Sequence, residues 1–212
     1  MEVFDQNGNL DSDVQEVLYE LGNAGVGMAS ATIGRILGVR VALATPKVIP
    51  VGERTSQVLR ELMQQDNVGI WMKFLEPMKG SVLFILKQSF VYDVVEKMTE
   101  SRYEGNALYE EEIAFSAVKE FANMLAAAYT KAIGKYTGIR IFMSPSMLVL
   151  DKERVSLGEI LQNQGTDTKK AIWVETSFRL LEKEGDETCG LGRVVMLPDA
   201  AAVQLFAKAF GL

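Results

Sequence analysis

The 212-residue sequence predicts an α+β fold in which two copies of one helix-and-strand unit share a mainly antiparallel sheet. Segments with a helical apolar period alternate with short apolar runs that end near glycine or proline, and this order of segments occurs twice. Five residues of the first half also recur 100 positions later: Glu20, Asn23, Gly34, Gly38 and Arg40 recur as Glu120, Asn123, Gly134, Gly138 and Arg140. We therefore expect one pseudo-two-fold domain over residues 1–212, built from repeats at about 11–100 and 108–212.

The first repeat begins with an amphipathic helix from Asp11, because its apolar residues recur at i, i+3, i+4 and i+7. Glycines at 22, 25 and 27 either let two helices pack closely or mark a helix break, and a break near Gly25 is expected because glycine is unfavourable inside helices. A second helix is then expected at Met28–Leu37, ending at Gly38. The remaining elements are expected to be a strand at Val39–Ala44, a helix at Glu53–Gln64, strands at Val68–Leu75 and Gly80–Leu86 with a turn at Glu76–Pro77, and a helix at Phe90–Thr99.

The second repeat shows the same order of elements. A long helix is expected over Leu108–Lys135, and Gly138 follows it as a stop signal. The later elements are expected to be a strand at Ile139–Met143, a short helix at Leu157–Gln162, strands at Ala171–Leu180 and Gly190–Leu197, and a final helix opened by Pro198 and running to about Phe210. Trp71 and Trp173 fall on corresponding strands, where core packing is the expected role.

Composition excludes several classes of function. The sequence has no histidine, which excludes Ser-His-Asp and Cys-His catalysis and zinc bound by histidine. Cys189 is the single cysteine, so no internal disulfide or CxxC motif exists. A net charge of −6 disfavours nucleic acid as a partner. The N-terminus lacks a signal-peptide pattern and no apolar run is long enough to span a bilayer, so we expect a cytoplasmic protein without membrane contact.

A glutamate and an asparagine form a pair at the same place in both long helices. Glu20 and Asn23 are spaced i, i+3 and therefore lie on one helix face, opposite the apolar stripe; Glu120 and Asn123 repeat this arrangement. A single exposed pair of this kind is usually only solvated. Asparagine, however, costs roughly 0.5 kcal/mol against alanine inside a helix. Its presence twice, at equivalent positions, therefore indicates a functional role.

The segment Glu20–Ala29 resembles the signature helix of the CheC family of chemotaxis phosphatases. The family pattern is Asp or Ser, three residues, Glu, two residues, Asn, and a proline after 22 further residues. Glu20, Asn23 and Pro46 fit it in the first repeat, and Ser116, Glu120 and Asn123 fit it in the second. There are two departures. Glu16 stands where Asp or Ser is usual, and Pro145 comes one residue early. The second repeat, which matches at all three helical positions, therefore ranks ahead of the first.

The resemblance implies hydrolysis of the aspartyl phosphate of a CheY-type response regulator. Asn23 or Asn123 would orient the attacking water, because an amide offers both a donor and an acceptor. Glu20 or Glu120 would pair with a lysine of the partner, and Glu16 and Ser116 would also contact it. The chain itself would bind no metal or other cofactor, since the required Mg²⁺ would sit in the regulator. The resemblance further implies a monomer.

Two other functions stay open. The chain could be an adaptor without catalysis that binds the deamidase CheD or a response regulator, or a binding module related to the flagellar switch. A switch component would usually carry an added C-terminal domain, and the chain ends straight after its final predicted helix. A stand-alone carboxylate hydrolase would need a concave pocket holding Glu20 or Glu120. The helical pattern predicts a convex face there instead.

Overall fold

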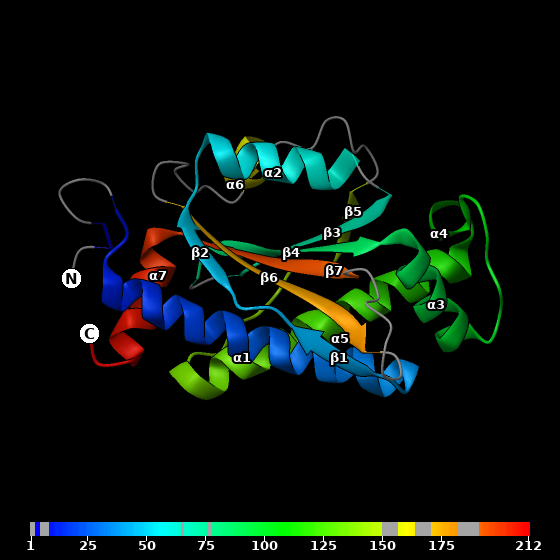
Figure 1. The fold of residues 1–212 in the computed structure, drawn as a ribbon, viewed down its shortest axis with the longest axis horizontal. Coiled ribbons are helices and arrows are strands. Elements are labelled where there is room, and N and C mark those ends of the chain that lie inside the picture. Colours follow the sequence, from blue (N-terminus) through cyan, green and yellow to red (C-terminus); the bar gives the residue numbers. More distant parts are fainter. Residues whose placement is uncertain are drawn as a thin grey trace.

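The computed structural model describes residues 3–4, 9–64, 66–75, 78–149, 157–163, 171–181 and 191–212. Within these residues a central sheet is covered by helices on both faces (Figure 1). The helices are α1 (Ser12–Leu37), α2 (Glu53–Gln64), α3 (Gln88–Thr99), α4 (Ala107–Glu110), α5 (Glu112–Thr137), α6 (Leu157–Asn163) and α7 (Ala200–Ala209). The strands are β1 (Arg40–Leu43), β2 (Lys47–Pro50), β3 (Asn67–Lys73), β4 (Gly80–Lys87), β5 (Met147–Val149), β6 (Ile172–Leu181) and β7 (Gly192–Pro198).

Strands from both repeats form the sheet, in the order β1-β6-β7-β4-β3-β5. Strand β2 also pairs with β6. It occupies the first part of the β6 edge, at Ile172–Glu175, and β1 occupies the later part, at Phe178–Leu181. Each pairing between named strands is antiparallel. The β3–β4 hairpin of the first repeat receives β5 from the second, and the β6–β7 hairpin of the second receives β1 and β2 from the first. The predicted α+β fold with a shared, mainly antiparallel sheet is therefore confirmed.

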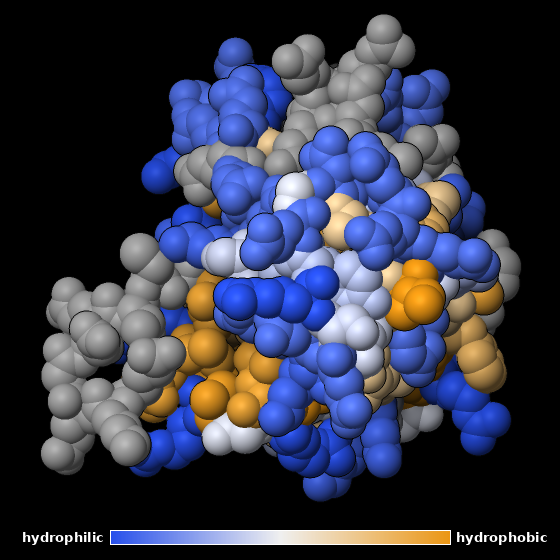
Figure 2. Space-filling view, turned by 90° about the vertical axis from the view of Figure 1, so that its right-hand side faces the viewer, coloured by the Kyte–Doolittle hydropathy of each residue, from blue (hydrophilic) through white to orange (hydrophobic). Residues whose placement is uncertain are grey.

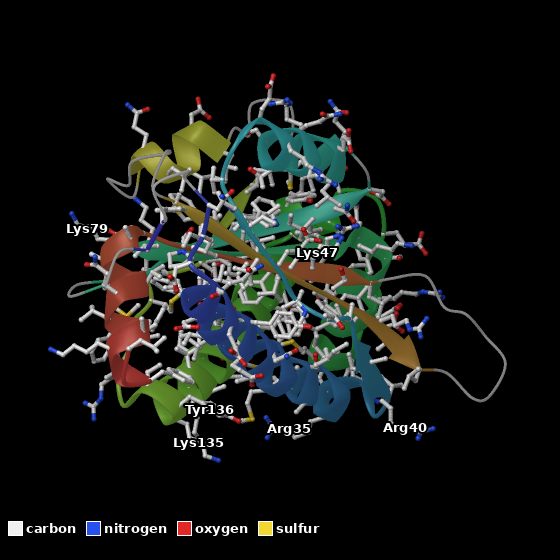
Figure 3. All side chains as sticks on the ribbon, turned by 60° about the vertical axis from the view of Figure 1, so that its left-hand side comes forward. Arg35, Arg40, Lys47, Lys79, Lys135 and Tyr136 are labelled. Atoms are coloured by element: carbon white, nitrogen blue, oxygen red, sulfur yellow. The ribbon has the colours of Figure 1, made fainter. Side chains whose placement is uncertain are left out.

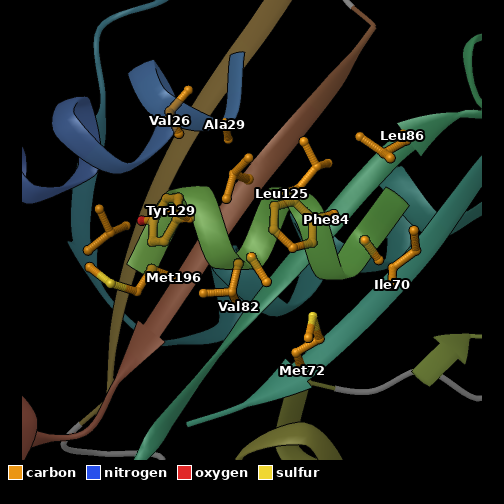
Figure 4. Close-up of a cluster of buried hydrophobic side chains, with 14 of the residues drawn as sticks. Val26, Ala29, Ile70, Met72, Val82, Phe84, Leu86, Leu125, Tyr129 and Met196 are labelled. Carbon is orange, nitrogen blue, oxygen red and sulfur yellow. The ribbon is translucent and has the colours of Figure 1, made fainter. Parts of the chain in front are cut away.

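Alternating side chains of the strands enter two separate cores. The larger core lies between the sheet and α1, α3, α5 and α7, where Leu125 and Tyr129 pack against Phe84 and Met196 (Figure 4). The smaller core lies beneath α2 and α6 and holds Trp71 and Trp173 from β3 and β6. Both tryptophans are thus core residues, as predicted.

Hydrophilic and apolar residues are distributed unevenly over one end of the molecule. Hydrophilic residues cover most of the end of the molecule formed by α3 and α4, and apolar residues gather toward its lower left (Figure 2). No helix in the described part of the chain is both long enough and apolar enough to cross a membrane.

The predicted helix break near Gly25 is wrong, because α1 runs unbroken from Ser12 to Leu37. Asp11 caps its start by accepting hydrogen bonds from the backbone N–H groups of Asp13 and Val14. Gly38, with φ of 72°, caps its end. Tertiary packing stabilises the glycine-rich middle of the helix, since its buried face lies against α5 and the sheet.

The predicted strand at Ile139–Met143 is also wrong. Only Met143 forms an isolated bridge, to Phe74. Its counterpart β1 pairs with the far end of β6, which has ten residues, whereas β3 has seven and ends at Lys73. The segment after α5 therefore has no full strand to pair with. The short strands β2 and β5 were not anticipated, because each follows a proline and has three or four residues.

Two helix boundaries also differ from the sequence prediction. The long helix predicted from Leu108 is interrupted at Glu111, whose extended backbone separates α4 from α5. The last helix begins at Ala200 rather than at Pro198. Asp199 caps it by accepting a hydrogen bond from the Ala202 N–H at 2.8 Å, and Pro198 ends β7. The predicted turn at Glu76–Pro77 lies outside the described residues.

Candidate functional site

The two Glu–Asn pairs stand on the two longest helices, α1 and α5, which pack side by side in opposite directions (Figure 1). The apolar stripe of each helix enters the larger core, so the opposite face points outward. Glu20, Glu120 and Asn123 are exposed, and Asn23 is half-buried. In the described part of the chain, neither asparagine side chain has a hydrogen-bond partner. Both amides are therefore available to another molecule.

Glu16 and Ser116, the further positions predicted to contact a partner, are also exposed, each one helical turn before its glutamate. Each helix thus carries three of the predicted residues on one outward stripe. The two stripes belong to different helices, so the structure presents two separate candidate sites rather than one composite site.

The first pair is held in place by close packing at Gly22, which lies between Glu20 and Asn23 in the sequence. Gly22 is buried, and a Cβ added there would stand 3.0 Å from Cγ1 of Val174 on β6 and 3.5 Å from Cβ of Pro46. Pro46 is itself buried. The proline at the family spacing therefore packs against the helix at the level of the pair, and it fixes the connection between β1 and β2 there.

The second pair is supported differently. Pro145 is exposed, whereas Ser146 is buried. Ser146 stands 100 positions after Pro46, and its hydroxyl donates to the backbone oxygen of Lys119 at 3.4 Å, next to Glu120. A serine thus occupies the place of the buried proline. The early proline changes the connecting segment and leaves the exposed stripe of α5 intact.

Each stripe borders a hollow. A hollow of about 380 Å³ adjoins the first, and its lining residues are Asp13, Glu16, Val17, Glu20, Phe210 and Leu212. The predicted convex face is therefore wrong for Glu20. All the carboxylates in this hollow are exposed, so it lacks the desolvation by which carboxylate hydrolases tune their acid and base groups.

The second hollow, of about 400 Å³, lies on α5 beyond Asn123. Its lining residues are Ala127, Thr130, Lys131, Gly134, Gly138, Ile139, Arg140 and Ile141. It contains two cationic side chains and no carboxylate. The two candidate sites thus have surroundings of opposite charge, an asymmetry that the repeated motif alone did not reveal.

Titratable groups with a shifted pKa are found elsewhere in the described chain. Burial, and next the charge of Glu96, raises the pKa of Asp93. Burial alone raises the pKa of the Tyr129 phenol, which lies in the larger core. Among the described residues no group of three or more acidic, cysteine or histidine side chains is arranged to hold a metal ion.

Sequence reasoning missed a buried carboxylate at Glu175 on β6. Its Oε2 accepts a hydrogen bond from Nε1 of Trp173 at 2.9 Å, and its Oε1 pairs with Arg193 of β7 at 2.5 Å. A charged residue within an otherwise apolar strand was the available signal. Because both oxygens have partners within the sheet, the group is structural.

Comparison with known proteins finds two curated bacterial relatives of this chain. No protein-family model matches the chain. It is 24% identical over 178 residues to the CheY-P phosphatase CheC of Bacillus subtilis (strain 168), covering 80% of this chain and 81% of CheC. It is 23% identical over 198 residues to the flagellar motor switch phosphatase FliY of the same organism, covering 92% of this chain but 47% of FliY. The chain therefore spans about half the length of that relative.

Solved structures share the fold. The Thermotoga maritima FliY structure superposes with a TM-score of 0.67 at 18% identity, covering 95% of this chain and 98% of that one. A chain from the FliG–FliM complex of H. pylori gives a TM-score of 0.63 at 9% identity, covering 94% and 100%. The fold and the paired outward stripes define a duplicated α+β protein with one shared antiparallel sheet. The chain is thus similar in sequence to the curated proteins named CheC and FliY, and similar in fold to the solved FliY structure.

Proposed function

We propose that this chain is a phosphatase that hydrolyses the aspartyl phosphate of a CheY-type response regulator. The observation that carries the proposal is the outward-facing Glu–Asn pair, present on both long helices, with amides that have no partner in the described part of the chain. Relatives named as phosphatases of CheY-P and of the flagellar switch support it.

The proposed reaction forms no covalent bond to this chain. Phosphoryl transfer depends mainly on positioning and on stabilising charge, so a water held in line with the breaking bond is the main requirement. The Asn123 amide oxygen would accept a hydrogen bond from that water, and the amide N–H groups would bind a phosphoryl oxygen. Positioning of this kind can lower the barrier by several kcal/mol. Glu120 would pair with a cation of the partner and fix the helix in its pocket.

The second site is the better candidate for catalysis. Asn123 is exposed, whereas Asn23 is half-buried, so the amide of Asn123 can enter a partner's pocket more deeply. Glu16 also places a longer, charged side chain where the second repeat has Ser116. Together with Asp13 and Glu20, it gives the first site three neighbouring carboxylates, which would repel an acidic phosphorylation pocket.

The test is the decay rate of a phosphorylated CheY-type regulator in the presence of Mg²⁺, with and without this protein. Asn123→Ala is expected to remove most of the acceleration, on the order of a hundredfold. Asn23→Ala is the matched control from the other repeat and should have a much smaller effect. Both substitutions lie outside the apolar cores, so the unfolding free energy should change by less than about 0.5 kcal/mol.

Full activity in the Asn23→Ala/Asn123→Ala double variant would exclude this mechanism. If only Asn23→Ala loses activity, the first site is the catalytic one. An absence of acceleration by the unaltered protein, with binding to the regulator retained, would favour an alternative: an adaptor without catalysis. That alternative is supported by the similar fold of a chain from the FliG–FliM complex, which is a protein–protein assembly.

A further inference from the structure

The hollow beside α5 continues the stripe that carries the second Glu–Asn pair. At about 100° per residue, Ser116, Asn123, Ala127 and Gly134 fall within a narrow sector of the helix surface, since they are spaced by seven, four and seven residues. Ala127 and Gly134 line the hollow. Its helical wall is therefore the direct extension of the candidate site toward the C-terminus of α5.

Small residues and the returning chain create this hollow. Gly138, with φ of 70°, reverses the chain, which then passes close to Gly134. A Cβ added at Gly134 would stand 2.9 Å from the Ile139 backbone oxygen, so only glycine permits this approach. The segment 139–141 then forms the second wall. Because that segment pairs with no strand, the hollow stays open beside the helix.

Two cations, Lys131 and Arg140, line the hollow, and both side chains are exposed. Among the residues that the structure describes, neither has a carboxylate partner. The C-terminal end of α5 contributes roughly half a negative charge at this place, which two full positive charges exceed. The hollow is thus a local positive site on a chain whose net charge is −6.

We propose that this cationic hollow binds an acidic side chain of the response regulator and sets how the regulator docks on the second site. The inference rests on the proposed function and adds a second contact to it. Lys131 lies eight residues after Asn123, which corresponds to about 12 Å along the helix axis. The acidic group of the partner therefore stands about that far from its aspartyl phosphate, outside the phosphorylation pocket itself.

The first repeat lacks this feature, which provides a matched control. Ala31 occupies the position equivalent to Lys131, so Arg40 is the single cation of the corresponding set. Arg40 and Lys135 lie near opposite ends of the helix pair (Figure 3), and Lys135 is one turn from Lys131 on α5. Arg40→Glu thus changes the same charge as Arg140→Glu at a distant place.

The experiment measures steady-state dephosphorylation against the concentration of a phosphorylated CheY-type regulator, for the Lys131→Glu/Arg140→Glu variant. Charge reversal should raise KM about tenfold, with a much smaller effect on kcat, because rim charges act on association and affinity. The neutral Lys131→Gln/Arg140→Gln variant should give a smaller increase, and Arg40→Glu should leave KM unchanged. Raising NaCl from about 50 to 300 mM should raise KM for the unaltered protein more than for the variant.

An unchanged KM in both α5 variants, or an equal increase in Arg40→Glu, would overturn the docking inference while leaving the phosphatase proposal in place. Docking without phosphatase activity is detected by a binding titration with the regulator loaded with beryllofluoride, which mimics its phosphorylated form. Binding that weakens in the Lys131→Glu/Arg140→Glu variant, without any dephosphorylation by the unaltered protein, would support the docking site and reject the enzyme. If the unaltered protein neither binds nor dephosphorylates the regulator, both proposals are rejected.

Discussion

Gly25 of α1 lies directly against the ring of Tyr129 of α5. A Cβ added at Gly25 would stand 2.5 Å from Cε2 of that ring, closer than real Cβ contacts allow. Tyr129 is 1% exposed and belongs to the larger core. This glycine therefore serves the close packing of the two helices that carry the candidate sites, and it does not break the helix.

Gly25→Ala is expected to lower the free energy of unfolding by about 2–3 kcal/mol, because the buried ring has no free space into which to move. Urea unfolding followed by circular dichroism measures the change. Gly27→Ala in the same helix is the matched control. A Cβ there would meet nothing within 4 Å, so the substitution should stabilise by about 0.5–1 kcal/mol. Equal effects of the two substitutions would contradict the packing argument.

Glycine substitutions at the ends of two helices should have opposite effects on stability, depending on whether glycine is introduced or removed. Gly38 and Gly138 end α1 and α5 in the left-handed conformation, whereas Glu100, with φ of 56°, ends α3 in the same way. Glu100→Gly should stabilise the protein by about 0.5–1 kcal/mol, because the strain of a side chain in this region is relieved. Gly138→Ala should cost about 1 kcal/mol, although its Cβ would meet no atom within 4 Å. Thermal unfolding of both variants checks the two signs, and a stabilising Gly138→Ala would refute the explanation.

The buried carboxylate of Glu175 predicts a coupled pair of substitutions. Arg193→Met should destabilise by about 2–3 kcal/mol, since it leaves a charge uncompensated at a residue that is 4% exposed. The cost is below that of a fully buried pair because the Arg193 side chain is 36% exposed. Adding Glu175→Gln should recover most of the loss, because glutamine keeps an acceptor for Nε1 of Trp173. Additive costs in a double-mutant cycle would show that the ion pair is unimportant.

Much of the fold could be predicted from local patterns. Helix α2 was predicted with its exact bounds, and the strands β3, β4 and β6 within two residues, because each is a continuous periodic or apolar segment bounded by turn residues. The unbroken α1 could not be predicted. Its glycines oppose a helix locally, and only the ring of Tyr129, about a hundred residues away in the sequence, explains why a glycine is needed at 25.

The candidate residues divide in the same way. The spacing of Glu20 with Asn23, and of Glu120 with Asn123, places each pair on one helix face, since helix periodicity is a local property. That Asn123 is more exposed than Asn23 is visible only in the tertiary structure, which also packs Pro46 against Gly22 and Ser146 against the backbone of Lys119. The positive charge of the second hollow depends on Lys131 of α5 and Arg140 of the following segment, which the fold brings together. In the first hollow, the acidic side chains all lie on α1, and the fold brings Phe210 against them.

By itself, the sequence determined the duplication, the α+β class and the two Glu–Asn pairs, because these follow from composition, periodicity and short-range spacing. Tertiary structure alone decided that each hairpin takes its edge strands from the other repeat, and that the segment 139–143 forms no strand. It also decided that the two similar helices face opposite electrostatic surroundings. The physical reason is that strand pairing and surface charge depend on contacts between segments that are distant in the sequence, and local sequence patterns do not specify those contacts.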